Sequence, residues 1–301
     1  MALFPSEDTI LGYNASPMPV RPLSPFSILA EAWMFFRKQP ALNAVLVAFL
    51  ILPGWGINIF VRLSDPDDLL SVTTAGRFLA RTDPYHIIPL VLSLVLLILY
   101  FWGMAGVLLV GKRMIQNRAG RSRSSFAAVR RGSARLVLPL LLTHLLRFCF
   151  GLYWGLLFII PATILFFANR SIFLPLLLPL LLPAILYQIR TSLFTAALAA
   201  EGKAYREALR RSRDITRGHL LITVGNLFVI GAILFLAAGI VGALATGILG
   251  TIDPRFLVTA DLVDVTAQSF AILLSSLATI ELFGRLREAR EGKVKEVVPV
   301  D

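Results

Sequence analysis

Long apolar runs, separated by short polar segments, extend through most of this 301-residue chain. A helix needs roughly 20 apolar residues to cross about 30 Å of hydrocarbon at about 1.5 Å per residue. Runs of that length lie at about 41–61, 88–111, 137–160, 172–198, 219–248 and 257–283. The pattern predicts an all-α polytopic membrane protein with six transmembrane helices.

The third and fourth runs are irregular. Apolar character continues past Pro161 to Ala168, so the third helix is either long and tilted or broken at Pro161. The fourth run contains Pro175, Pro179 and Pro183 at spacings of i, i+4 and i+8. Because each proline removes an intrahelical hydrogen bond, the outer half of this helix is predicted to be bent or irregular.

Short amphipathic segments precede the first, third and fifth runs, at 26–33, 126–133 and 205–212. In such helices the apolar face lies in the headgroup boundary and arginines meet anionic lipid, at about 1 kcal/mol per basic residue. The chain therefore resembles three units of interfacial helix plus transmembrane hairpin. The alternative is that basic loops beside a membrane acquire this pattern without any repeat.

The composition agrees with a membrane protein. Hydrophobic residues make up 57% of the chain and charged residues 16%, whereas soluble chains have about 25% charged residues. The predicted parts are a flexible N-terminal tail, a six-helix membrane domain and a C-terminal tail, at 1–25, 26–292 and 293–301.

The net charge of +11 is unevenly distributed. Segment 112–136 carries eight Lys or Arg and no acid, and the loops of one side together carry 22 against five on the other. The positive-inside rule then places both termini in the cytoplasm of a cell-membrane protein. Anionic lipid headgroups are the expected partners. Nucleic acid is not expected, since no RNA-binding signature or zinc-ligand spacing accompanies the basic residues.

A compact motif joins the fourth and fifth runs. Its residues are Glu201, Gly202, Ala208, Leu209, Arg210, Ser212, Thr216, Arg217 and Gly218. This motif resembles the membrane-domain family associated with glycerophosphoryl diester phosphodiesterases, and the resemblance extends over 26–292. Near its end, Gly284 and Arg285 stand where that pattern has an aromatic residue and an acid.

The resemblance implies a stand-alone membrane domain without the catalytic barrel of those enzymes. Phosphodiesterase activity is therefore not expected, and His86, His144 and His219 form no His-Arg pair of the required kind. With these three scattered histidines and the single Cys149, we expect no metal site. No cofactor and no enzymatic activity are predicted.

The motif also has a reading that is independent of the family. Gly202 tolerates a positive φ, so Glu201 and Gly202 can end one helix and begin a turn. Ser212 and Thr216, spaced i and i+4, share a face and can bond back to the helix. The motif is then either structural or a binding surface for lipid or a cytoplasmic partner.

Arg147, Arg190, Glu281 and His144 are the candidate polar residues at membrane depth. Arg147 and Arg190 fall near the bilayer midplane, where a charge costs about 2.5–3.5 kcal/mol, so both are expected to face the interior and find a partner. Glu281 is the acid we expect to pair with one of them. His144 precedes Arg147 by one turn and shares its face. These residues form either a proton or anion pathway or a hydrogen-bonded structural cluster.

The sequence thus favours a non-enzymatic membrane scaffold or regulator that binds lipid or a partner through a basic cytoplasmic face. A homo-oligomer is compatible with this expectation. The alternative is a transporter or lipid-translocating component that uses the polar groups of the third, fourth and sixth helices. A cavity lined by Arg147 and Arg190 would favour transport, and a dry, ion-paired bundle would favour the scaffold.

Overall fold

The computed structural model describes residues 23–64, 87–115, 125–168 and 182–296, and all regular structure in these ranges is helical. The predicted all-α class is confirmed. Five helices are long and apolar enough to cross a membrane: Pro40–Ile59, Leu94–Ile115, Phe126–Leu157, Leu220–Ile252 and Leu257–Arg290. They correspond to the first, second, third, fifth and sixth predicted runs. The fourth run, 172–198, lies partly outside the described residues, so the count of six stays a prediction.

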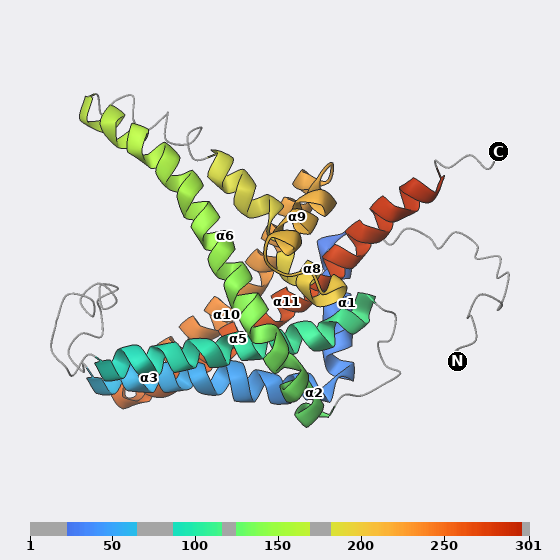
Figure 1. Ribbon diagram of the computed structural model, residues 1–301. Helices are drawn as coiled ribbons and strands as arrows, with labels where there is room; N and C mark the ends of the chain where they lie inside the picture. Colours follow the sequence, from blue (N-terminus) through green and yellow to red (C-terminus); the bar gives the residue numbers. More distant parts are fainter. Residues whose placement is uncertain (1–22, 65–86, 116–124, 169–181, 297–301) are drawn as a thin grey trace.

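The first membrane-length segment consists of consecutive helical pieces that continue into one another. They are α2 (Pro40–Val45), the π-helical turns of η1 (Leu46–Ile51) and α3 (Leu52–Ser64). This segment lies beside α5 (Ile87–Ile115), and the two run along the bottom of the molecule in Figure 1.

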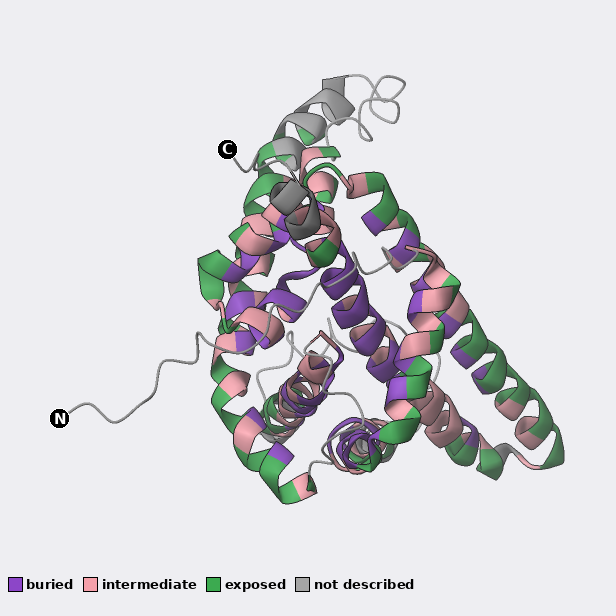
Figure 2. Ribbon diagram, turned by 90° about the vertical axis from the view of Figure 1, so that its right-hand side faces the viewer, coloured by how far each residue is buried: buried purple, intermediate pink, exposed green. Residues whose placement is uncertain are grey.

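The core of the molecule surrounds α11 (Leu257–Glu296), which forms a hairpin with α10 (Leu220–Ile252) through the short turn η3 (Pro254–Phe256). Leu273, Leu277 and Phe283 of α11 are completely buried. Buried positions concentrate where these helices meet, as Figure 2 shows. Helix α11 continues through Glu296, beyond the predicted end of the membrane domain at 292.

Helix α6 (Phe126–Ala168) is one uninterrupted helix. It passes Pro161 without a break, so of the two alternatives the long helix is the one observed. Its 43 residues span about 64 Å, twice the thickness of the hydrocarbon core, which requires a strong tilt or a projecting end. In Figure 1 it diverges from α5 toward the upper left. Phe148, in its middle, is 60% exposed, as expected for a lipid-facing side chain.

The predicted threefold repeat is observed only in part. The amphipathic segments before the first and fifth runs form separate helices, α1 (Pro25–Lys38) and α9 (Tyr205–Thr216). The middle segment, 126–133, forms the first two turns of α6 instead. Trp102 of α5 fixes this segment by donating to the Ser133 hydroxyl at 3.0 Å. The repeat therefore stays a prediction.

A buried ion cluster holds α1 against α11. The Arg285 guanidinium contacts Glu281 at 2.8 Å, Glu31 at 3.0 Å and the Ser27 hydroxyl at 2.7 Å. Arg285 and Glu281 are each 3% exposed. The cluster satisfies the charges that burial of both side chains leaves without water.

This cluster corrects the expected pairing of Glu281 with Arg147 or Arg190. Glu281 pairs with Arg285, four residues later on the same helix. Residues at i and i+4 lie on one helix face, so the partner is local in the sequence. Arg285 thus has a structural role at a position where the resembling family has an acid.

We predict that Arg285→Gln destabilises the protein by about 3–5 kcal/mol, because it leaves the Glu281 carboxylate buried beside a neutral group. Thermal unfolding in detergent, followed by loss of helical circular dichroism, measures the change. The double variant Glu281→Leu/Arg285→Leu should recover most of the loss, since no buried charge then remains. Arg131→Gln, at an exposed position, is the control. A double variant as unstable as the single one would contradict the prediction.

Candidate functional site

A break in the helical backbone organises the site. A helix over 182–190 ends at a three-residue turn over 191–193, after which α8 (Phe194–Glu201) begins. The break therefore falls inside the predicted fourth run. It lies in the inner half of that run, whereas the predicted proline irregularity concerns the outer half, where Pro175 and Pro179 lie outside the described residues, so that irregularity stays a prediction.

Side chains of α9 satisfy the backbone groups that the break leaves unpaired. The Arg190 carbonyl accepts hydrogen bonds from the Ser212 hydroxyl at 2.9 Å and the Thr216 hydroxyl at 3.3 Å. The Leu193 amide donates to the same Ser212 oxygen at 3.1 Å. Buried backbone groups without partners cost about 1–3 kcal/mol each, so these bonds fix α9 across the turn.

Arg147 of α6 binds the same turn from the other side. Its guanidinium donates to the Gln188 carbonyl at 2.8 Å and to the Thr191 hydroxyl at 3.1 Å, and it lies 5.4 Å from the Phe194 ring centre. His144 also contacts Phe194, edge to face at 4.7 Å. His144 and Arg147 thus share a face as predicted, and their contacts are those of a structural cluster.

The start of α9 is fixed on α6. The Tyr205 amide donates to the Thr143 hydroxyl at 2.9 Å. Tyr205 has a φ of +55°, the left-handed region that costs a non-glycine residue about 1–2 kcal/mol. Gly202 and Gly218, on either side of α9, have φ values of +69° and +85°. The predicted positive φ at Gly202 is confirmed.

The motif divides into a buried and an exposed set. Ala208, Leu209, Ser212 and Thr216 are buried against the rest of the protein. The exposed positions are Gly202, Arg210, Arg217 and Gly218, and Glu201 is half-buried. One part of the motif therefore builds the fold and another part presents charge.

Glu201 ties α8 to α9. Its carboxylate accepts from Arg211 at 2.8 and 2.9 Å and from Lys203 at 2.9 Å. Burial raises the pKa of this carboxyl, but the hydrogen bonds from Arg211 and Lys203 outweigh burial and leave the pKa below its ordinary value of 4.5. The sequence did not predict the pairing of Glu201 with Arg211, which depends on how the turn between α8 and α9 brings the two helices together.

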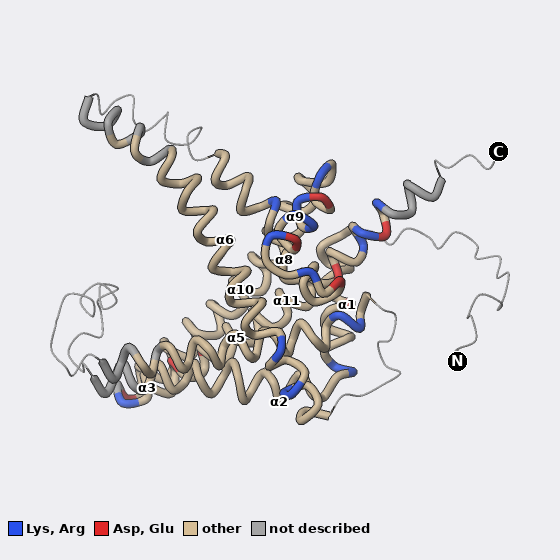
Figure 3. The backbone as a smooth tube through the Cα atoms, viewed as in Figure 1, with Lys and Arg blue, Asp and Glu red and all other residues tan. Residues whose placement is uncertain are grey.

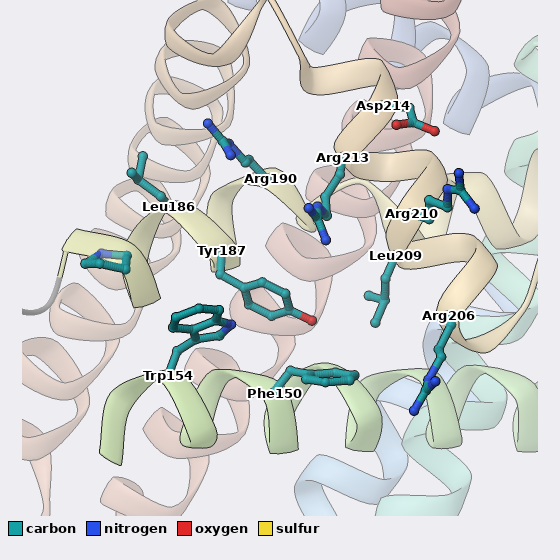
Figure 4. A pocket seen from close by; sticks show the side chains of 11 residues that line it. Phe150, Trp154, Leu186, Tyr187, Arg190, Arg206, Leu209, Arg210, Arg213 and Asp214 are labelled. Carbon is teal, nitrogen blue, oxygen red and sulfur yellow. The ribbon is translucent and has the colours of Figure 1, made fainter. Parts of the chain in front are cut away.

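A cavity of about 940 Å³ lies between α6, the helix over 182–190 and α9. One side is basic, and its charged residues are Arg190, Arg206, Arg210, Arg213 and Asp214. The other side is apolar or aromatic, with Phe150, Trp154, Pro183, Leu186, Tyr187 and Leu209. Figure 4 shows Arg213 and the Tyr187 ring converging from α9 and the helix over 182–190, above the aromatic side chains of α6.

The cavity changes the picture of the intramembrane arginines. Arg190 is exposed and lines the cavity. Arg147 does not line it. The motif did not include Arg206 and Arg213, whose spacing with Arg210 (i, i+4 and i+7) places all three on one face of α9.

Lys and Arg gather around α9, α1 and the neighbouring helix ends, while α10 has no Lys, Arg, Asp or Glu (Figure 3). Within the described ranges, no group of three or more His, Cys, Asp or Glu could hold a metal ion. Comparisons of the chain with protein-family models, with curated proteins and with solved structures find no match. The family resemblance of the 200–218 motif therefore stays a prediction.

We predict that Ser212→Ala destabilises the protein by about 1–3 kcal/mol, because the buried Leu193 amide loses its acceptor. The loss is measured by thermal unfolding of the full chain in detergent. Thr251→Ala is the control, since its exposed hydroxyl bonds only to the Ile248 carbonyl of its own helix. Equal effects of the two substitutions would contradict the role of Ser212 at the break.

We further predict that Glu201→Gln lowers stability at pH 7 by about 1.5–3 kcal/mol, the range for hydrogen bonds to charged groups. Since the folded pKa of Glu201 lies below 4.5, this stability is complete above the unfolded pKa and is lost as the pH falls through the folded value. The difference from wild type should therefore be constant above about pH 5.5 and shrink below 4.5. A constant difference down to pH 3 would contradict this, and the exposed Glu207→Gln is the control.

Proposed function

We propose that this chain is a non-enzymatic integral membrane protein that binds an anionic phospholipid in the cavity between α6, the helix over 182–190 and α9. The observation that carries the proposal is the combination of four arginines with an aromatic wall in one cavity. A phospholipid presents the same combination, with a phosphate beside apolar chains.

The charges favour a phosphate ligand. Guanidinium groups bind phosphate oxygens in pairs of parallel hydrogen bonds. Arg190 reaches the cavity from one element, and Arg206, Arg210 and Arg213 from another. Asp214 is the acid on this lining, so the cavity has an excess of positive charge and attracts an anion.

The aromatic wall favours the headgroup region of a membrane. Phe150 and Trp154 lie one turn apart on α6, and aromatic side chains with one polar and one apolar neighbour are typical of that boundary. The apolar face of α6 continues beyond them through Leu157 and Ile160, which are 43% and 59% exposed. Acyl chains can lie along this face.

Binding is favoured over transport because of Arg147 and His144. A transport path through α6 requires polar groups that change partners. Arg147 instead donates to the turn over 191–193, and His144 lies between Phe101 and Phe194. The polar groups of α6 thus support the fold beside the cavity.

The test is lipid titration of the full chain in detergent, monitored by native mass spectrometry with phosphatidylglycerol. The triple variant Arg190→Gln/Arg210→Gln/Arg213→Gln should bind about 100-fold more weakly, at about 1 kcal/mol per basic residue. The matched control is Arg130→Gln/Arg131→Gln/Arg135→Gln, which removes the same charge from exposed positions on α6. Unchanged binding in the cavity variant, or equal losses in both variants, would overturn the proposal.

A further inference from the structure

We infer that the cavity selects a phosphomonoester lipid, such as phosphatidic acid, over lipids whose phosphate is a diester. This inference rests on the proposed function, because it names the headgroup class of the same site. It follows from how many charges in the cavity are already compensated, and from where they lie.

Two of the arginines in the cavity lie close to another side chain, an aromatic ring in one case and an acid in the other. Arg206 lies over the Phe150 ring, with its guanidinium carbon 6.0 Å from the ring centre. Arg210 stands one helical turn before Asp214, so the two share a face and their charges offset one another. Arg206 keeps its charge in this contact, so the four arginines and Asp214 leave the lining with an excess of positive charge.

Arg190 and Arg213 approach the ligand position from two different elements. Neither Arg190 nor Arg213 takes part in the ion pairs found among the described residues. Tyr187, whose ring lies 6.2 Å from that of Phe150, adds a hydroxyl between the arginines and the aromatic wall. A lining with several arginines and a tyrosine hydroxyl matches a group of charge near −2 with three acceptor oxygens better than a group of charge −1.

A phosphomonoester is that group. It carries about −1.5 to −2 charges at pH 7, with a second pKa near 6, and presents three acceptor oxygens. A phosphodiester carries one charge and presents two terminal oxygens, so it would compensate less of the positive charge of the lining. The cavity volume of about 940 Å³ and the wall of Phe150 and Trp154 add a requirement for apolar mass. A free phosphate would leave that wall uncovered, and a lipid covers it.

The pH dependence of binding distinguishes a monoester ligand from a diester ligand. The charged and titratable groups that face the ligand from all three elements are Tyr187, Arg190, Arg206, Arg210, Arg213 and Asp214. Histidine, whose ordinary pKa lies between 5 and 8, is not among the described residues of the lining. Between pH 7.5 and 5 the change of charge therefore occurs on the monoester ligand.

The experiment compares phosphatidic acid, phosphatidylglycerol and phosphatidylcholine with identical acyl chains, each titrated into the full chain in detergent by native mass spectrometry. At pH 7.5 phosphatidic acid should bind about tenfold more tightly than phosphatidylglycerol, as expected for one additional charge-assisted contact. At pH 5 the two affinities should agree within about twofold, because the monoester has lost one charge. Arg190→Gln or Arg213→Gln should remove the preference at pH 7.5, and the exposed Arg131→Gln should retain it.

The outcomes separate this inference from the proposed function. Equal binding of both anionic lipids, still lost in the triple cavity variant, overturns the monoester preference alone. A tighter complex with phosphatidylglycerol also overturns it and assigns Asp214 to the headgroup hydroxyls. If the triple cavity variant binds lipid as tightly as the wild type, both proposals are overturned. Glycerol 3-phosphate and inorganic phosphate should not displace phosphatidic acid at equal concentration, and displacement by either would show that the ligand is a soluble phosphate.

Discussion

A helix that breaks among apolar segments leaves backbone carbonyl and amide groups that must find partners elsewhere in the chain, because hydrocarbon offers none. In this protein the break lies at 191–193, and the partners come from two sides. Ser212 and Thr216 bind the Arg190 carbonyl from α9, and Arg147 binds the Gln188 carbonyl from α6. The turn therefore joins three elements that are far apart in the sequence.

The same constraint explains why an arginine is tolerated within α6. A guanidinium at membrane depth is costly when isolated, but Arg147 has a carbonyl, a hydroxyl and an aromatic face around it. The Arg147 guanidinium donates to oxygen atoms at the break, and these oxygens in turn satisfy its N–H groups. The contacts of α9 with the turn have a further consequence, since they set the orientation in which the remaining face of α9 meets the cavity.

Local features of this structure were predictable, and long-range pairings were not. The lengths of the apolar runs predicted the five membrane-length helices, and Gly202 predicted the left-handed end of α8. Helix length and helix ending both depend on residues that are close in the sequence. Charge matching gave Glu281 the wrong partner, although Arg285 lies four residues away. The role of Arg147 could not be predicted, since hydropathy does not reveal that Thr191 lies in a turn. The three arginines of α9 that line the cavity were recognisable only by their common face.

Spacing along α9 separates the arginines that build the fold from those available to a ligand. Arg206, Arg210 and Arg213 recur at i, i+4 and i+7 and meet the cavity, whereas Arg211 points about 100° away from Arg210 and binds Glu201. If Glu201 lay on the cavity side, its carboxylate would cancel part of the positive charge there. Because Glu201 precedes the αL turn at Gly202, it meets the opposite flank of α9. A short helix thus closes the break with hydroxyl groups, binds α8 through one arginine and directs three arginines to the cavity.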